Sequence, residues 1–450
     1  MKSNSVKIAL VGAGSRSFGP TTVRDVLLND ALCSLDLELW LMDINPDTVE
    51  KVREYAEGVA AKLGRKVKIE STTELARALD GADFVVDAIE ISRDVFWAMD
   101  YHIPRKHGIN QIYGENGGPG SHFHALRNMR PIVEIAKTME SHCPDGLLLN
   151  YTNPMHKLCQ AACNLSKTKT IGLCHGVYMG MGQLSFMLGI PQDEIEYEAS
   201  GINHFTWFQT LRRKPSGEDL YPLLRELDAT ADWFADWHEI GISRILLRRF
   251  GLYPSPGTNH IGEYIGWADE FYANELHWFY DPMDGDPWNG GATPEFLYSM
   301  GAMDLKRPFK RRALSPLNLE LDEIRFSGEA AIPIMEAIVC DRETPLAAVN
   351  VPNNGLMPGL PDDLIVEVPA TANGTGLHPK TMPALPEPVL SMIRVQASIQ
   401  QLLVEAYVEQ SKAKLLQAVL LEPVVHSYRA AVSTVNELLD LQKDLLPPLY

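Results

Sequence analysis

The sequence predicts an α/β protein: a Rossmann-like, doubly wound parallel sheet domain with a second α+β domain. Short apolar runs alternate with helical stretches over the first 195 residues, which is typical of a parallel sheet. These runs are continuously apolar, which indicates that both faces of the sheet are covered. Beyond residue 195 the alternation ends, and we therefore expect domains at 1–195 and 196–450.

The chain opens with the pattern of a strand, a glycine turn and a helix. An apolar run at 6–11 leads into a turn at 12–14, and a helix is expected at 21–28. Glycines there allow the backbone to approach a pyrophosphate at the positive end of the helix. Ser17 stands where the third glycine of this motif belongs, although the nearby Gly19 can still permit close packing. The predicted cofactor contacts in this turn are Gly12, Gly14, Ser15 and Phe18.

Asp43 ends the second apolar run, at 37–42. A carboxylate at that strand end binds ribose hydroxyls and disfavours a 2′-phosphate, which favours NAD as the cofactor. The alternative is that Asp43 caps the helix that begins near Pro46.

The remaining elements follow the same reasoning. In the first half we expect strands at 84–89, 147–149 and 170–173 and helices at 48–62 and 155–164. In the second half the pattern changes at 199–211, and we expect helical material at 220–250, a strand at 364–368 and long amphipathic helices from 386 to 446.

Three polar clusters each follow a short apolar run. They are Asn153, Cys174-His175 and Asn203-His204. Open parallel sheets bind ligands at the carboxyl ends of their strands, so we expect one pocket that contains a thiol, two imidazoles and two amides.

Composition narrows the class of protein. With 40 basic and 58 acidic residues, the formal charge of −18 disfavours nucleic acid and anionic membranes as partners and favours a small molecule. The N-terminus lacks a signal-peptide pattern, no run is long enough to span a membrane, and six cysteines in 450 residues are not a disulfide scaffold. We therefore expect a cytoplasmic protein.

Several motifs occur in a fixed order along the chain and indicate a protein family. The motifs are Gly12-Ala13-Gly14-Ser15, Gly114-Glu115-Asn116 with Gly118-Pro119-Gly120, Phe123 to Arg127, Asn153-Pro154, Cys174-His175-Gly176-Val177, Gly201-Ile202-Asn203-His204-Phe205, Glu263-Tyr264 and Val351-Pro352-Asn353-Asn354-Gly355. Together they resemble glycoside hydrolase family 4, the NAD- and Mn²⁺-dependent glycosidases, as far as about residue 369.

The resemblance implies roles for the polar clusters. Cys174 and His204 would hold Mn²⁺ or another divalent metal. The residues implied to bind sugar hydroxyls or line the same site are Asn153, His175 and Asn203, and Asn153 also belongs to the cofactor site. Glu115, which replaces an aspartate common in the family, would assist the leaving group. Tyr264 is the first choice for the base that removes the C2 proton, and His260 is the second.

The chemistry implied by this resemblance is redox-neutral. NAD⁺ removes hydride from C3, which acidifies the C2 proton, and the metal stabilises the resulting enolate. The glycosidic oxygen leaves by elimination, water adds, and hydride returns to C3. These enzymes stand outside the usual two-carboxylate scheme for glycosidases.

The residues after the metal cysteine indicate the substrate. Cys174-His175-Gly176 is similar to the pattern of α-glucuronidases and related uronidases of the family. A uronate requires a cation, and the candidates are Arg93, Arg312 and Arg325. The alternatives within the family are α-galacturonidase, α-galactosidase and α-glucosidase.

Two alternatives lie outside the family. A 2-hydroxy-acid dehydrogenase would share the fold and release NADH, but it would not need the pair Cys174 and His204. A non-catalytic NAD-binding sensor would bind the cofactor without turnover. The C-terminal helices favour a homodimer or homotetramer, although they can equally pack within the chain.

Overall fold

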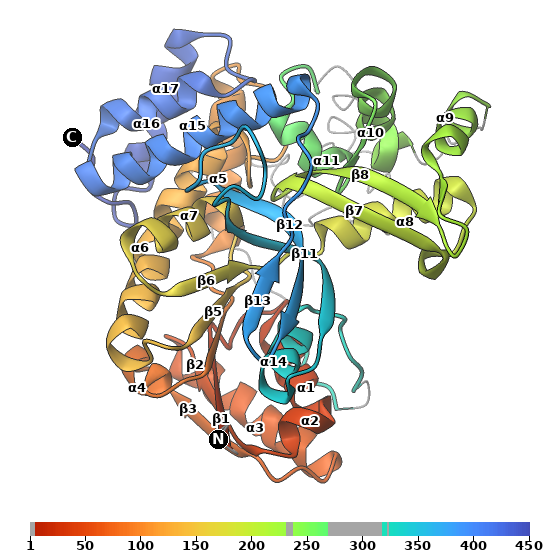
Figure 1. Ribbon diagram of the computed structural model, residues 1–450. Coiled ribbons are helices and arrows are strands. Elements are labelled where there is room, and N and C mark those ends of the chain that lie inside the picture. The colour runs from red at the N-terminus through yellow and green to blue at the C-terminus, as the bar shows by residue number, and fades with distance from the viewer. Residues whose placement is uncertain (1–4, 231–236, 269–316, 322–323) are drawn as a thin grey trace.

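The computed structural model describes residues 5–230, 237–268, 317–321 and 324–450. Within them, 13 strands form one sheet, drawn in Figure 1. The strands are β1 Ser5–Val11, β2 Asp36–Met42, β3 Lys68–Thr72, β4 Phe84–Asp87, β5 Leu147–Asn150, β6 Lys169–Gly172, β7 Ile195–Ile202, β8 Phe205–Arg213, β9 Glu218–Asp219, β10 Tyr253–Ser255, β11 Thr344–Pro352, β12 Ile365–Asn373 and β13 Gly376–Pro379.

Helices cover this sheet and extend beyond it. Those of the first half are α1 Gly19–Leu28, α2 Asp30–Cys33, α3 Pro46–Lys62, α4 Leu75–Leu79, α5 Arg93–Lys106, α6 Gly118–His142, α7 Met155–Leu165 and α8 Gly176–Leu188. Those that follow are η1 Gln192–Glu194, α9 Tyr221–Thr230, α10 Trp237–Phe250, α11 Thr258–Ile261, η3 Gly262–Tyr264, α14 Ala331–Cys340, α15 Glu387–Glu409, α16 Lys412–Leu421 and α17 Tyr428–Leu441.

The first six strands form the predicted parallel sheet. They pair in the order β3-β2-β1-β4-β5-β6, and all five pairings are parallel. Alternate residues of β1 enter different cores: Ile8 and Leu10 pack with the α1 and α3 side, and Ala9 and Val11 with the α6 and α7 side. Both faces are therefore buried, and the Rossmann-like α/β prediction is confirmed.

The sheet continues without a break into the second half. β11 pairs antiparallel with β6, with Asn350 opposite Gly172, and β12, β7, β8 and β10 follow in that order. The stretch at 199–211 spans parts of two strands, because the chain turns back at Asn203-His204 and forms the antiparallel pair β7 and β8. His204 lies in that turn with φ 63°.

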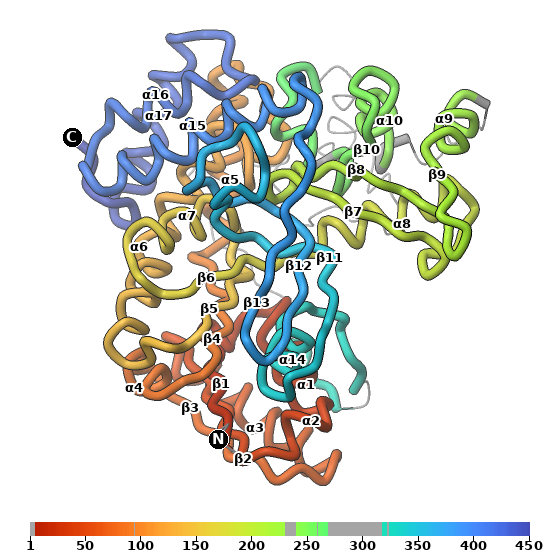
Figure 2. Tube along the Cα trace, viewed as in Figure 1, coloured from red at the N-terminus to blue at the C-terminus, as the bar shows by residue number. Residues whose placement is uncertain are grey.

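The C-terminal helices return to the first half. Figure 2 shows α15, α16 and α17 beside α6 and α7, and residues such as Ile399, Leu403 and Leu438 are fully buried in the core that those helices share. Internal packing therefore uses one face of these helices. None of the described helices combines the length and apolarity needed to cross a membrane.

Candidate active site

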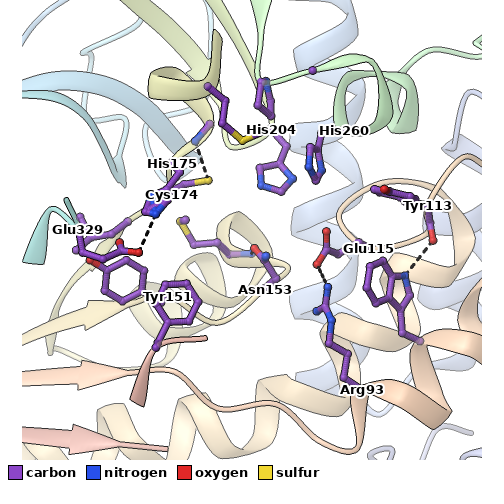
Figure 3. A pocket seen from close by; sticks show the side chains of 18 residues that line it. Arg93, Tyr113, Glu115, Tyr151, Asn153, Cys174, His175, His204, His260 and Glu329 are labelled. Atoms are coloured by element: carbon purple, nitrogen blue, oxygen red, sulfur yellow. Dashed lines mark hydrogen bonds and ion pairs between the residues drawn. The ribbon is translucent and has the colours of Figure 1, made fainter. Parts of the chain in front are cut away.

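A cavity of about 420 Å³ lies where β5 and β6 end (Figure 3). Tyr151 and Asn153 follow β5, and Leu173 and Cys174 follow β6. The predicted site residues that line it are Phe18, Arg93, Glu115, Asn153, Cys174, His175, His204 and His260. The structure thus brings together residues that the sequence separates by up to 242 positions, counted from Phe18 to His260.

The glycine turn has the geometry that the dinucleotide motif requires. Gly12 has φ +80°, and a Cβ there would lie 2.6 Å from the Ala88 carbonyl oxygen. A Cβ on Gly19 would lie 2.0 Å from the Ala13 carbonyl oxygen. Gly19 therefore allows the close packing of helix on strand that the missing third glycine provides elsewhere.

Asp43 lies against this turn. Its carboxylate accepts hydrogen bonds from the backbone N–H of Gly14 at 2.8 Å and of Asn45 at 3.0 Å. The cap of α3 is Asn45, whose side chain accepts from the Thr48 N–H at 3.1 Å. The capping alternative for Asp43 is therefore wrong, and the carboxylate stays at the strand end beside the turn.

Cys174 and His204 reach the cavity from different elements. Cys174 follows β6, and its sulfur accepts a hydrogen bond from the Gly176 N–H at 3.3 Å. Burial and the nearby Glu367 raise the pKa of the Cys174 thiol to about 12. A divalent cation would therefore have to displace the thiol proton as it binds.

A second set of metal-binding groups surrounds His204. Ligand atoms of Glu115, His204 and His260 lie within 4.8 Å of one another, a group that does not include Cys174. The two imidazole centroids are 4.4 Å apart, and Nδ1 of His260 is buried without a hydrogen-bond partner among the described residues. Two imidazoles and a carboxylate, with the Cys174 thiol on the same cavity, are donor types that bind divalent cations.

Charge in this part of the cavity is set by Arg93. Its guanidinium pairs with Glu115 and, at 3.1 Å, with Glu90. Burial raises the pKa of Glu115, but Arg93 and the neighbouring histidines outweigh it and bring that pKa to about 2. Burial lowers the pKa of His204 to about 3 and also lowers that of His260. At neutral pH the carboxyl is ionised and both imidazoles are neutral.

Tyr264 and Asn203 do not line the cavity. The Tyr264 hydroxyl is buried and donates to the Asn203 carbonyl at 3.1 Å, and burial raises the pKa of Tyr264 well above its usual value. The Asn203 amide donates to the carboxylate of Glu367 at 3.4 Å. This geometry disfavours Tyr264 as a base and makes Asn203 a support for the residues around it.

The structure adds residues that the sequence did not indicate. Glu329 lines the cavity, pairs with His175 at 2.7 Å and precedes α14. Tyr151 stacks on Phe18 with ring centroids 4.7 Å apart, and its hydroxyl accepts the Ala331 N–H at 3.1 Å. No local pattern marks Glu329, because it reaches the cavity from a segment more than 150 residues after His175.

Of the three arginines proposed to bind a uronate, Arg325 and Arg312 are not among the described residues that line this cavity. Arg312 lies outside the described part of the chain. Arg93 is the arginine that lines it.

The chain is similar to known glycosidases over nearly its whole length. The chain is 30% identical to an α-glucosidase of Erwinia rhapontici, over 98% of this chain and 99% of that protein. It is 27% identical to an α-galacturonidase of Thermoanaerobacterium saccharolyticum, over 99% and 98%. A crystal structure of a 6-phospho-α-glucosidase from gut microorganisms, in complex with NAD and Mn²⁺, matches with a TM-score of 0.77 and 21% identity, over 99% of this chain and 100% of that one.

Family models match nearly the whole chain. The family 4 glycosyl hydrolase model matches residues 7–190, and the model of the family 4 glycosyl hydrolase C-terminal domain matches residues 199–425. The resemblance drawn from the motifs is thereby confirmed, and the chain belongs to glycoside hydrolase family 4.

Proposed function

We propose that the protein is a NAD- and divalent-metal-dependent α-glycosidase that cleaves its substrate by oxidation, elimination and re-reduction. The observation that carries this proposal is the presence of Cys174 and His204 on one cavity, beside a glycine turn built for a dinucleotide. A thiol and an imidazole are metal ligands that hydrolysis by two carboxylates does not need.

The cofactors and the chain divide the chemistry between them. When bound, NAD would supply reversible hydride transfer at C3, and a divalent cation would supply Lewis-acid stabilisation of the enolate. Cys174 and His204 would hold the cation. Asn153 and His175 bind sugar hydroxyls, and the stacked rings of Phe18 and Tyr151 form the wall next to the glycine turn.

His260 removes the C2 proton. It lines the cavity, its lowered pKa keeps it unprotonated at neutral pH, and Glu115 lies close enough to stabilise the imidazolium that forms. Glu115 is ionised in the free site, so it serves the leaving group as an acid only if the entry of substrate loosens its pair with Arg93.

The preferred substrate is an α-glycoside of a uronic acid, most simply an α-glucuronide. A Cβ on Gly176 would meet only ordinary contacts, the nearest being Pro256 Cβ at 3.5 Å and Cys174 Sγ at 3.6 Å. Packing therefore does not require glycine at position 176, and the space without a side chain is available to the carboxylate of a uronate. Arg93 lines the same cavity and is the guanidinium that would pair with this carboxylate.

A neutral sugar is the second candidate. Glu329 places a carboxyl on the cavity wall beside His175. The guanidinium of Arg93 already forms ion pairs with Glu90 and Glu115, which leaves less of its positive charge for a uronate. A carboxyl and an imidazole are well suited to hydroxyl groups, as an α-glucoside or α-galactoside would present.

Cellular location and assembly complete the proposal. All six cysteines are free, which is consistent with the cytoplasm. The exposed apolar side chains of α16 and α17, Leu420, Leu421 and Leu441, are consistent with a homodimer or homotetramer.

A substrate panel tests this function. The p-nitrophenyl α-glucuronide, α-galacturonide, α-glucoside and α-galactoside are assayed with NAD and Mn²⁺ together, and with each withheld. We expect cleavage that needs both cofactors, with the highest kcat/KM for a uronide and no accumulation of NADH. Cleavage without NAD would overturn the function, net NADH release would favour a dehydrogenase, and preference for a neutral sugar would select the second candidate.

A further inference from the structure

The imidazole of His204 has a partner, Asn116, that is not among the residues lining the cavity. Nδ1 of His204 lies 3.0 Å from Nδ2 of Asn116, and Asn116 is fully buried. Since Nδ1 is occupied, Nε2 is the nitrogen left to bind a cation. A metal-binding nitrogen carries no proton, so the neutral ring must then carry its proton on Nδ1.

That protonation state determines which end of the amide faces the ring. An N–H at Nδ1 needs an acceptor, and the acceptor of Asn116 is Oδ1. The two ends of an amide have the same shape and exchange by a half-turn about the last side-chain bond. Oδ1 has no other hydrogen-bond partner among the described residues, so no existing bond opposes this half-turn. One end of the amide lacks a partner either way, and the need for a bare Nε2 selects the orientation.

The loop that carries Asn116 is held firmly. The carboxyl group of Glu263 accepts the backbone N–H of Glu115 at 2.6 Å and that of Asn116 at 3.1 Å. A Cβ on Gly117 would lie 2.6 Å from the Glu263 carbonyl oxygen, so the loop is pressed against η3. The backbone of Asn116 therefore cannot follow the ring if the ring turns.

His204 itself lies in a tight turn, where its backbone has φ 63°. That conformation is uncommon for a residue with a side chain and fixes the direction of the Cα–Cβ bond, but it does not fix rotation of the ring. The contact with Asn116 supplies this second constraint.

We propose that Asn116 is a positioning residue for the metal site: its Oδ1 accepts the Nδ1–H of His204 and so holds the imidazole with a bare Nε2 towards the cation. This inference rests on the proposed metal-dependent function. It differs from that function in naming the group that selects the tautomer.

Two substitutions test whether Asn116 acts as a hydrogen-bond acceptor or only fills space. Asn116→Asp keeps an acceptor facing Nδ1, and Asn116→Leu keeps the size and removes it. The readout is Mn²⁺ affinity of the full chain, freed of metal by a chelator, measured from the electron paramagnetic resonance signal of free Mn²⁺. We expect Asn116→Leu to weaken binding by about 10- to 100-fold and Asn116→Asp to stay within about threefold of the unmodified protein.

Asn29→Leu is the matched control. Asn29 is also buried, accepts the Leu32 N–H at 2.9 Å and lies between α1 and α2, so it loses a similar bond without touching His204. Its Mn²⁺ affinity should not change, and NAD affinity should be constant in all three variants.

The inference is wrong if Asn116→Leu binds Mn²⁺ as tightly as the unmodified protein does. It is also wrong if a folded Asn116→Asp shows the loss of Mn²⁺ affinity that is expected for Asn116→Leu. The second result also decides the matter if Asn116→Leu does not fold. Cys174→Ser in the same assay tests the proposed function separately. If it binds Mn²⁺ normally, the proposed metal site fails, whereas loss in Cys174→Ser with no change in Asn116→Leu removes only the role of Asn116.

Discussion

Two parts of the site are built in different ways. The dinucleotide wall is the turn after β1 and the start of α1, with Asp43 at the end of β2, and it reaches the cavity through Phe18. The metal wall takes Glu115, Cys174, His204 and His260, all of which line the cavity, from four segments spread over 146 positions.

This difference determines how each wall is held. Backbone geometry fixes the dinucleotide wall, because Gly12 and Gly19 allow contacts that a side chain would block. Buried polar side chains fix the metal wall: Glu263 holds the loop of Glu115, and Glu367 accepts hydrogen bonds from Thr206 and Asn350 beneath the turn of His204. A substitution in the dinucleotide wall should therefore weaken NAD binding without changing metal binding, and a substitution in the metal wall should do the reverse.

The largest expected effect is on the metal wall. Cys174→Ser replaces a soft thiolate ligand and should lower kcat/KM by roughly 10³-fold, equivalent to several kcal/mol of lost Lewis-acid stabilisation. NAD affinity, measured by quenching of protein fluorescence, should stay unchanged, because Cys174 takes no part in the glycine turn. Equal losses of NAD affinity and activity would show that the walls are not independent.

The next effect distinguishes two candidate bases on the metal wall. His260→Ala should lower kcat by about 10²- to 10⁴-fold, the usual contribution of a general base. Tyr264→Phe should leave kcat within a few-fold and lower the free energy of unfolding by about 1–3 kcal/mol, because the Asn203 carbonyl loses its donor. The reverse order of the two kcat values would restore Tyr264 as the base.

A smaller effect is expected on the dinucleotide wall. In Gly14→Ala the new Cβ would lie 2.7 Å from the Asp43 Oδ2 and 2.5 Å from the Thr48 Cγ2, so the bond between Gly14 and Asp43 must lengthen. We expect NAD affinity to fall about tenfold, the loss of one hydrogen bond to a charged group. Titration calorimetry with Mn²⁺ should show no change, and weakened Mn²⁺ binding would contradict the separation.

The last effect concerns stability and pH rather than catalysis or NAD binding. Burial, with a contribution from Glu115, raises the pKa of Glu263 from its usual 4.5 to about 8. Between these values the native protein keeps a proton that the unfolded chain has released, so this group makes the free energy of unfolding fall as pH rises from about 5 to 8.

Glu263→Gln has no such proton to keep. Urea unfolding at pH 5, 6.5 and 8 should therefore show that the unmodified protein loses roughly 2–4 kcal/mol more than the variant across this range. Glu50→Gln, on the exposed side of α3, is the control and should follow the unmodified protein. Parallel curves for Glu263→Gln would mean that the native carboxyl is ionised throughout.

The sequence predicted the dinucleotide wall well because its determinants are local. Strand periodicity and glycine spacing act over a few residues, and the observed β1 and β2 begin one residue before the runs expected at 6–11 and 37–42. The third glycine is absent from its usual place, and Gly19, two positions further on, allows the close packing as expected.

The metal wall was predicted only in part. Family motifs indicated Cys174, His204 and His260, and all three line the cavity. The supports could not be predicted, because contacts such as Glu329 with His175 or Asn116 with His204 join segments separated by 154 and 88 positions. The hairpin was missed for a similar reason: the apolar pattern runs through 199–211, and only the left-handed turn at His204 divides it.

In the proposed mechanism, bond cleavage proceeds through temporary oxidation at C3 and loss of the C2 proton. Hydrolysis of the preferred α-glycoside in D₂O, with NAD and Mn²⁺ present, tests it by NMR of the released sugar. We expect deuterium at C2 with no accumulation of NADH. Full retention of protium at C2 during complete turnover would contradict it.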